Sequence, residues 1–201
     1  MTVGGKRIAL IVVTWLIVAL VVSASGRLEA LRPPAPQVVI AVLTLLSLGA
    51  TLFVSSLRSW TDEAPIRWFV ALHLTRLIAG IYFLVLAVRG ALARGFAIPA
   101  GWGDIFVALL ALILILAVTP HTPTARRCYA AWNILGLIDI LFVIGNAART
   151  GLANPLSMKP LLQLPLSLLP TFLVPLILTT HIILIRRLAG PAAVRRDARP
   201  S

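Results

Sequence analysis

Six long apolar runs, separated by short polar connections, constrain this chain more than any other feature of its sequence. A helix needs about 20 apolar residues to cross the hydrocarbon core of a bilayer. The chain has 201 residues, of which 60% are hydrophobic, whereas soluble domains hold about 45–50%. The sequence therefore predicts an all-α fold, a polytopic transmembrane bundle of six helices that occupies residues 1–188 as one domain. We expect the spans at residues 7–25, 37–57, 66–88, 98–118, 128–148 and 162–185.

The positions of the basic residues predict the orientation of this bundle. With both termini in the cytoplasm, 11 of the 18 Lys and Arg residues lie on the inner side and six on the outer side. Because cytoplasmic loops carry an excess of Lys and Arg, this bias predicts an N-in/C-in topology. The segment 189–201 reads as a basic, disordered cytoplasmic tail.

The formal net charge of +12 would suggest a nucleic-acid partner in a soluble protein. Here the basic residues flank the apolar runs, where they set the topology and contact anionic lipid headgroups. We therefore expect the lipid bilayer as the partner, with anionic headgroups at the basic cytoplasmic side, and we expect no nucleic acid.

Polar and charged side chains inside the predicted spans mark the candidate site. A central Arg or Asp costs about 2.5–3.5 kcal/mol when it faces lipid, so such groups are expected to point into the bundle. With a rise of about 1.5 Å per residue, Arg76 and Asp139 fall at matching depth, which predicts a buried ion pair. The predicted polar core consists of His73, Arg76, Asp104, Asn133, Asp139 and His181.

Prolines and one glycine predict local geometry within the spans. Pro99 suits the first turn of the fourth helix, where a missing N–H costs nothing. Pro165, Pro170 and Pro175 fall within the sixth predicted span, where each removes a backbone hydrogen bond and can kink the helix. The freed carbonyls would line a cavity or be taken up by neighbouring helices. Gly136 permits a neighbouring helix to approach the fifth span closely.

The leading functional hypothesis is the binding or passage of a small solute or ion, linked to protons. His73, Asn133 and His181 fall in one layer toward the cytoplasmic end, where the histidines would form a gate or proton relay, since histidine exchanges protons near neutral pH. Arg76 and Asp139 would form a central switch. We predict no catalytic residue, no metal site and no resident cofactor, and an enzyme is the less favoured class.

Two alternatives use the same polar residues differently. The similar depth of His73 and His181 permits them to be axial ligands of a haem b held between two helices. The polar groups would otherwise serve assembly alone, in a structural or accessory membrane subunit, because small bundles also use buried polar residues for packing.

A further alternative comes from the segment "GWGDIF". Gly101, Gly103 and Asp104 resemble the GxGD signature of intramembrane aspartyl proteases, in which two carboxylates share a proton and activate water. The second carboxylate would have to be Asp139, on the following helix instead of the preceding one. More simply, Asp104 falls in the outer part of its span, as a first-turn carboxylate favoured by the helix dipole or as an outer access point for a solute.

The segments "IPAGWGDIF" and "AWNILGLIDI", followed by a proline-rich final helix that holds a histidine, resemble a group of small six-helix bacterial membrane proteins of unknown function. The GWGD and WNxxGxxD motifs carry this resemblance, which covers residues 66–188. It implies a multi-pass protein of the bacterial inner membrane, and it implies no activity.

Overall fold

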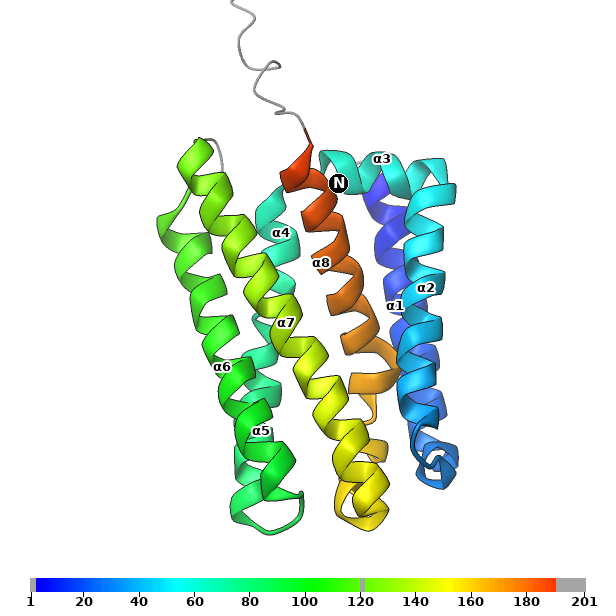
Figure 1. Ribbon diagram of the computed structural model, residues 1–201. Coiled ribbons are helices and arrows are strands. Elements are labelled where there is room, and N and C mark those ends of the chain that lie inside the picture. Colours follow the sequence, from blue (N-terminus) through cyan, green and yellow to red (C-terminus); the bar gives the residue numbers. More distant parts are fainter. Residues whose placement is uncertain (1–2, 120–121, 191–201) are drawn as a thin grey trace, which may run out of the picture.

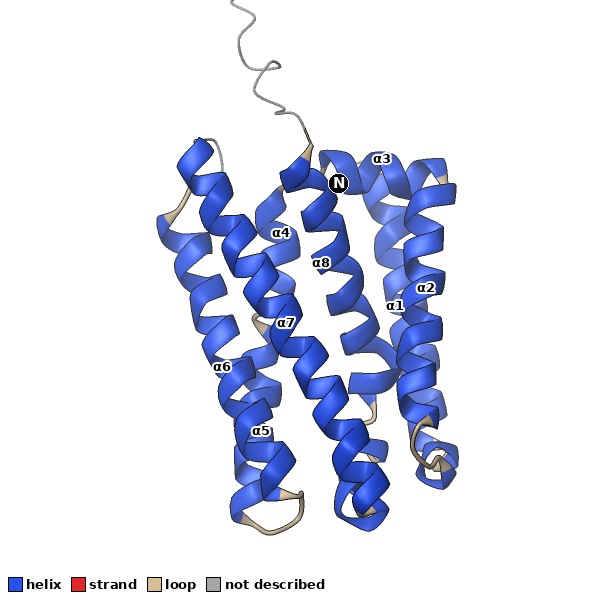
Figure 2. Cartoon of the chain, in the orientation of Figure 1, coloured by secondary structure: helices blue, strands red, loops and turns tan. Residues whose placement is uncertain are grey.

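The computed structural model describes residues 3–119 and 122–190, and these residues form helices joined by short loops, with no strand among them (Figures 1 and 2). Six helical stretches are long and apolar enough to cross a membrane, which confirms the all-helical prediction and indicates a multi-pass membrane protein. The elements are α1 (Val3–Ala24), η1 (Arg27–Ala30), α2 (Ala35–Phe53), α3 (Ser55–Glu63), α4 (Ile66–Leu72), α5 (Thr75–Val88), α6 (Arg94–Ala117), α7 (Pro123–Ala153), η2 (Pro155–Leu162), η3 (Leu169–Leu173) and α8 (Val174–Ala189).

Helix α8 lies in the centre of the bundle, with α1 and α2 on one side and α4 to α7 on the other (Figure 1). In the span formed by η3 and α8, 67% of an 18-residue apolar stretch is buried inside the protein, against 11% in α1 and in α2. The start of α1 and the end of α8 lie at the same end of the bundle, which we call the terminal end (Figure 1). We call the opposite end, which carries η1 and η2, the loop end. Residues 191–201, which make up most of the predicted tail, lie outside the described part of the chain.

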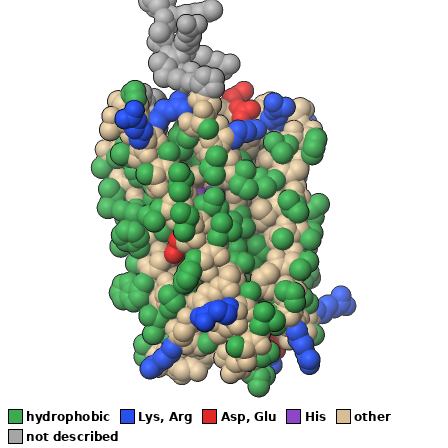
Figure 3. Space-filling view, viewed as in Figure 1, with side chains coloured by type: hydrophobic (Ala, Val, Ile, Leu, Met, Phe, Trp, Pro, Cys, Tyr) green, Lys and Arg blue, Asp and Glu red, His purple; other side chains and the backbone are tan. Residues whose placement is uncertain are grey.

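The surface of the bundle is apolar between its two ends. Hydrophobic side chains cover the middle of the face shown in Figure 3, and Lys and Arg side chains gather toward both ends. Large apolar residues such as Leu45 and Ile78 are 68% and 73% exposed. A surface of this kind suits the hydrocarbon core of a bilayer, where apolar side chains do not need to be buried by protein.

The second span is shorter than predicted, because α2 ends at Phe53 and residues 55–57 belong to α3. The 19 residues of α2 extend about 28 Å, which already matches the thickness of a bilayer core. The polar sequence that follows instead forms α3, which lies across the terminal end (Figure 1). Trp60 of α3 packs edge-on against Phe69 of α4, with 5.7 Å between ring centroids.

The third span is interrupted between α4 and α5, at His73 and Leu74. The backbone N–H of His73 donates to Val70 and that of Arg76 to His73, at 3.0 and 3.1 Å. These are three-residue hydrogen bonds, so the chain tightens into a 3₁₀ turn at the residues that begin the polar core. A 3₁₀ turn within a helix often marks a hinge or a strained sequence.

The fourth, fifth and sixth helices also begin or end away from the predicted residues. Helix α6 begins at Arg94, so Pro99 lies inside the helix instead of in its first turn. Helix α7 is longer than the predicted 128–148 at both ends. The last span begins with the π-helical turn η3, so Pro165, which the prediction placed in this span, precedes it. Only Pro170 and Pro175 lie within the observed span.

Two prolines within the spans, Pro99 and Pro175, each free a carbonyl that a side chain of a neighbouring helix takes up. Pro99 cannot donate to Gly95, whose carbonyl accepts the side-chain amide of Asn146 on α7 at 3.0 Å. Pro175 cannot donate to Thr171, whose carbonyl accepts the indole N–H of Trp15 on α1 at 2.9 Å. For the sixth span, the expectation that a neighbouring helix takes up a freed carbonyl therefore holds at Pro175.

The Asn146 contact predicts a coupling with Pro99. We expect Asn146→Leu to lower the free energy of unfolding by about 1–3 kcal/mol, because the Gly95 carbonyl loses its buried donor. In a Pro99→Ala chain, residue 99 regains an N–H that donates to Gly95, so the same substitution is expected to cost less. Unfolding of the four variants in mixed micelles measures this double-mutant cycle. An equal loss in both backgrounds would contradict the coupling.

Candidate functional site

The charged centre of the bundle consists of Arg76, Asp104 and Asp139. Arg76 lies in the first turn of α5 and is 2% exposed. Its Nε donates to Asp104 Oδ1 at 2.7 Å, and its Nη2 donates to Asp139 Oδ2. Its Nη1 donates to the carbonyl of Gly136 at 3.2 Å. The expected Arg76–Asp139 ion pair is present, and every nitrogen of the guanidinium has an acceptor on α6 or α7.

The sequence predicts that Asp104 belongs to the polar core, but it does not predict the pairing with Arg76 that the structure shows. It lies ten residues after Arg94, where α6 begins, and therefore about 15 Å along the helix. The predicted start at residue 98 placed it too close to the end of the helix. Asp104 is therefore not a first-turn carboxylate but a buried partner of Arg76.

Glycines in α5 and α6 allow the short aspartate side chains to reach Arg76. A Cβ on Gly80 would lie 2.6 Å from the carbonyl oxygen of Gly101, so α5 and α6 touch through their backbones at this point. Gly103 lies directly against the carboxylate of Asp139, leaving no room for a side chain. Both glycines of the "GWGD" segment thus serve the charged centre by close approach.

The charges of this centre do not balance. One guanidinium faces two carboxylates, and in residues 3–119 and 122–190 no second basic side chain lies within ion-pair distance of either. The side chains of Arg76 and Asp104 are only 1% and 6% exposed, whereas that of Asp139 is 16% exposed. An uncompensated charge is strongly disfavoured away from water. A bound proton or small cation would neutralise the second carboxylate.

The histidine layer lies beside the charged centre and consists of His73, His181, Asn133, Trp132 and Thr180. The two imidazole rings meet edge to face, with 4.4 Å between their centroids. Trp132 packs edge-on against His73, with 4.9 Å between ring centroids. Both histidines and Asn133 are at most 1% exposed. The sequence placed His73, Asn133 and His181 at one depth, and the structure brings them into one contact cluster.

Hydrogen bonds assign the proton on each imidazole. Asn133 donates through Nδ2 to the carbonyl of His181 at 3.1 Å, so its Oδ1 faces His181 Nδ1 at 2.8 Å and accepts from it. Thr180 donates to the carbonyl of Ile177 at 2.8 Å and accepts from His73 Nε2 at 3.1 Å. The lone pairs of neutral His181 Nε2 and His73 Nδ1 are then free. Both atoms are buried without a hydrogen-bond partner in the described part of the chain.

Gly136 connects the histidine layer with the charged centre. A Cβ at this position would lie 2.8 Å from His181 Cε1, so the expected close approach of a neighbouring helix occurs here, and its neighbour is α8. The carbonyl of the same residue accepts from Arg76. The six polar residues named from the sequence are therefore contiguous. Sequence reasoning missed Thr180, although its position next to His181 in "TTHII" was an available signal.

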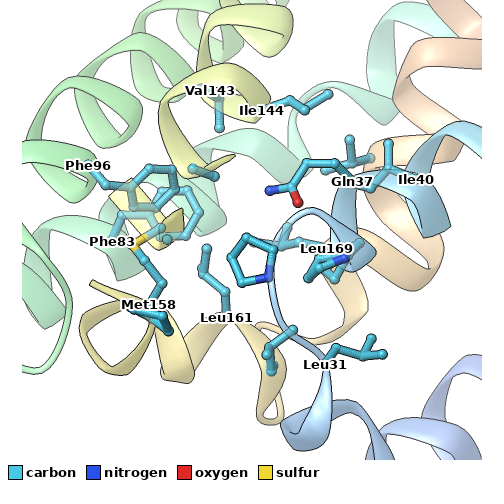
Figure 4. A pocket seen from close by; sticks show the side chains of 18 residues that line it. Leu31, Gln37, Ile40, Phe83, Phe96, Val143, Ile144, Met158, Leu161 and Leu169 are labelled. Atoms are coloured by element: carbon cyan, nitrogen blue, oxygen red, sulfur yellow. The ribbon is translucent and has the colours of Figure 1, made fainter. Parts of the chain in front are cut away.

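Two cavities approach the charged centre from the loop end. The small cavity, of about 30 Å³, is bordered by Thr75, Arg76 and Asp104 and has room for about two water molecules. The large cavity, of about 100 Å³, lies between α2, α7, η2 and η3 (Figure 4). The two share four lining residues, namely Phe83, Val143, Leu169 and Val174.

The fold and the site define a multi-pass helical membrane protein with a buried polar core. The chain belongs to a family described as a domain of unknown function, DUF8737, whose model matches residues 33–189. That match runs from the start of α2 to the end of α8, so it includes the charged centre and the histidine layer. No curated protein and no solved structure matches the chain.

The charged centre predicts a strong effect of removing its cation. We expect Arg76→Leu to lower the free energy of unfolding by about 3–5 kcal/mol, because two buried carboxylates lose their partner. Adding Asp104→Asn and Asp139→Asn to Arg76→Leu should restore part of the loss. Unfolding in mixed micelles measures both effects, with Arg89→Leu as the control because Arg89 is exposed. If Arg76→Leu is no less stable than Arg89→Leu, the charged centre does not stabilise the bundle.

Proposed function

We propose that this protein binds a small solute or ion within the membrane, or passes it across, in a proton-linked manner. The observation that carries the proposal is the charge imbalance of Arg76, Asp104 and Asp139. A site with one carboxylate in excess can take up its neutralising proton or cation from water on one side of the membrane and release it on the other. Buried ionisable residues arranged in this way are typical of ion pathways and proton relays.

The cavities and the histidine layer supply the two sides of such a path. From the loop end, the large and small cavities lead to Arg76 and Asp104. Beyond Gly136, the free ring nitrogens of His73 and His181 lie nearer the terminal end and offer sites for a proton. The small cavity limits any cargo in this conformation to a few atoms.

The haem alternative fits this arrangement poorly. Two axial imidazoles must lie on opposite faces of a macrocycle, with its iron between their nitrogens. Here the rings of His73 and His181 contact each other directly, and the Nε2 atom of His73 is engaged by Thr180. Binding a haem between them would require the helices that carry them to separate.

The protease alternative is also poorly supported by the geometry. An aspartyl dyad works because its two carboxylates share one proton. Asp104 and Asp139 instead each bind Arg76, which supplies a fixed positive charge to both of them. We therefore do not propose peptide hydrolysis.

Proton flux tests the proposed function. Protein reconstituted into liposomes that contain pyranine is expected to carry protons inward under a valinomycin-imposed potassium diffusion potential. Asp139→Asn should reduce this flux to the level of empty liposomes, because the excess carboxylate is gone. Asp62→Asn is the matched control, since Asp62 pairs with Arg186 at the exposed terminal end.

Flux that is equal in the native chain and the Asp139→Asn variant would contradict the central role of Asp139. Flux that never exceeds that of empty liposomes, from protein that co-purifies with a larger complex, would favour a structural or accessory subunit.

We also propose that the protein resides in a bacterial inner membrane with its terminal end in the cytoplasm, where its basic residues meet anionic headgroups. The single cysteine, Cys128, is exposed near the start of α7 at the terminal end and reports the orientation. A membrane-impermeant maleimide is expected to label it in inside-out vesicles and not in right-side-out vesicles. Arg89→Cys in a Cys128→Ser chain should be labelled in right-side-out vesicles and not in inside-out vesicles. Labelling of Cys128 in right-side-out vesicles, or of both cysteines from the same side, would overturn the topology.

A further inference from the structure

The large cavity at the loop end is apolar except for one side chain. Phe83, Phe96, Met158 and Leu161 form one wall, and residues of α2 form another (Figure 4). Gln37, near the start of α2, is the only polar side chain that lines it among the described residues. Neither the charged centre nor the histidine layer includes Gln37.

The amide of Gln37 points into this cavity (Figure 4). Its Oε1 atom is buried and has no hydrogen-bond partner in the described part of the chain. A buried acceptor without a donor costs about 1–3 kcal/mol, and the apolar walls of the cavity supply no donor side chain. The site is therefore complete only when a molecule in the cavity donates a hydrogen bond to this oxygen.

The size and the lining decide which kind of molecule suits the site. A buried water needs two to four polar partners, whereas the side chains here offer one. An apolar cavity of about 150 Å³ lined by Leu, Ile and Phe holds benzene. The cavity here is smaller, at about 100 Å³, so it limits the ligand to one small ring or a short alkyl chain.

We propose that the large cavity binds a small, mostly apolar molecule that carries one hydroxyl group, which donates to Oε1 of Gln37. The apolar part of the ligand contacts the walls formed by α2, α6 and α7, and the hydroxyl group fixes its orientation. The cavity also lies on the loop-end side of the proposed path. Binding of this ligand uses no residue of the charged centre or the histidine layer, so it does not require proton-linked passage.

Fluorine NMR of 4-fluorophenol and 4-fluorotoluene tests the site, because the two probes differ in the hydroxyl group and match closely in size. Binding is measured by saturation transfer to the micellar protein, with protein-free micelles subtracted. The native chain is expected to bind 4-fluorophenol about fivefold to tenfold more tightly than 4-fluorotoluene, the effect of one hydrogen bond.

Gln37→Leu is expected to abolish that preference while keeping the cavity apolar. Ala147→Leu, on the α7 wall, is expected to fill the cavity and weaken binding of both probes. Val38→Leu is the matched control, because Val38 neighbours Gln37 and is 54% exposed on the outside of α2. It should leave both affinities unchanged.

The proposal is overturned if the native chain shows no saturable binding, or if it binds both probes equally. A preference for 4-fluorophenol that survives Gln37→Leu would also overturn it. Because proton flux is measured separately in liposomes, failure of this site and failure of the proposed function are distinguishable.

Discussion

The guanidinium of Arg76 is the interaction on which the rest of the polar interior depends. It lies on α5 and binds acceptors on α6 and on α7, so one side chain joins three helices near the middle of the bundle. In lipid, apolar packing alone gives helices little preference for each other over the surrounding hydrocarbon chains. A buried cation with directional donors supplies that preference, and the glycines of α5 and α6 bring its partners within reach.

The histidine layer extends this centre without adding to its charge. His73 and His181 are held by neutral partners, and each keeps one ring nitrogen free. The interior therefore places one guanidinium and two carboxylates beside two imidazoles whose hydrogen-bond partners are neutral. Gly136 separates the two by the width of one backbone unit, which is why a substitution there would affect both.

The parts of this structure that follow from length and depth were predictable from the sequence. Six runs of bilayer length predicted six spans, and matching depth predicted the Arg76–Asp139 pair. The partnership of Asp104 was missed because α6 begins four residues before the predicted start, which moves Asp104 slightly more than one turn deeper. The interruption at His73 was missed because no proline or glycine marks it. The buried position of the Oε1 atom of Gln37 depends on the packing of α2 against α7 and η2, which are distant in the sequence, so no local sequence pattern predicts it.

The two carbonyls freed by Pro99 and Pro175 have a consequence for the order of the helices. A regular helix shows its neighbours a nearly uniform backbone, along which a partner can slide or rotate at little cost. Each proline replaces that uniform surface at one point with an acceptor that only a correctly placed donor satisfies. Asn146 and Trp15 are those donors, so the prolines set the axial register of α6 on α7 and of α1 on the last span.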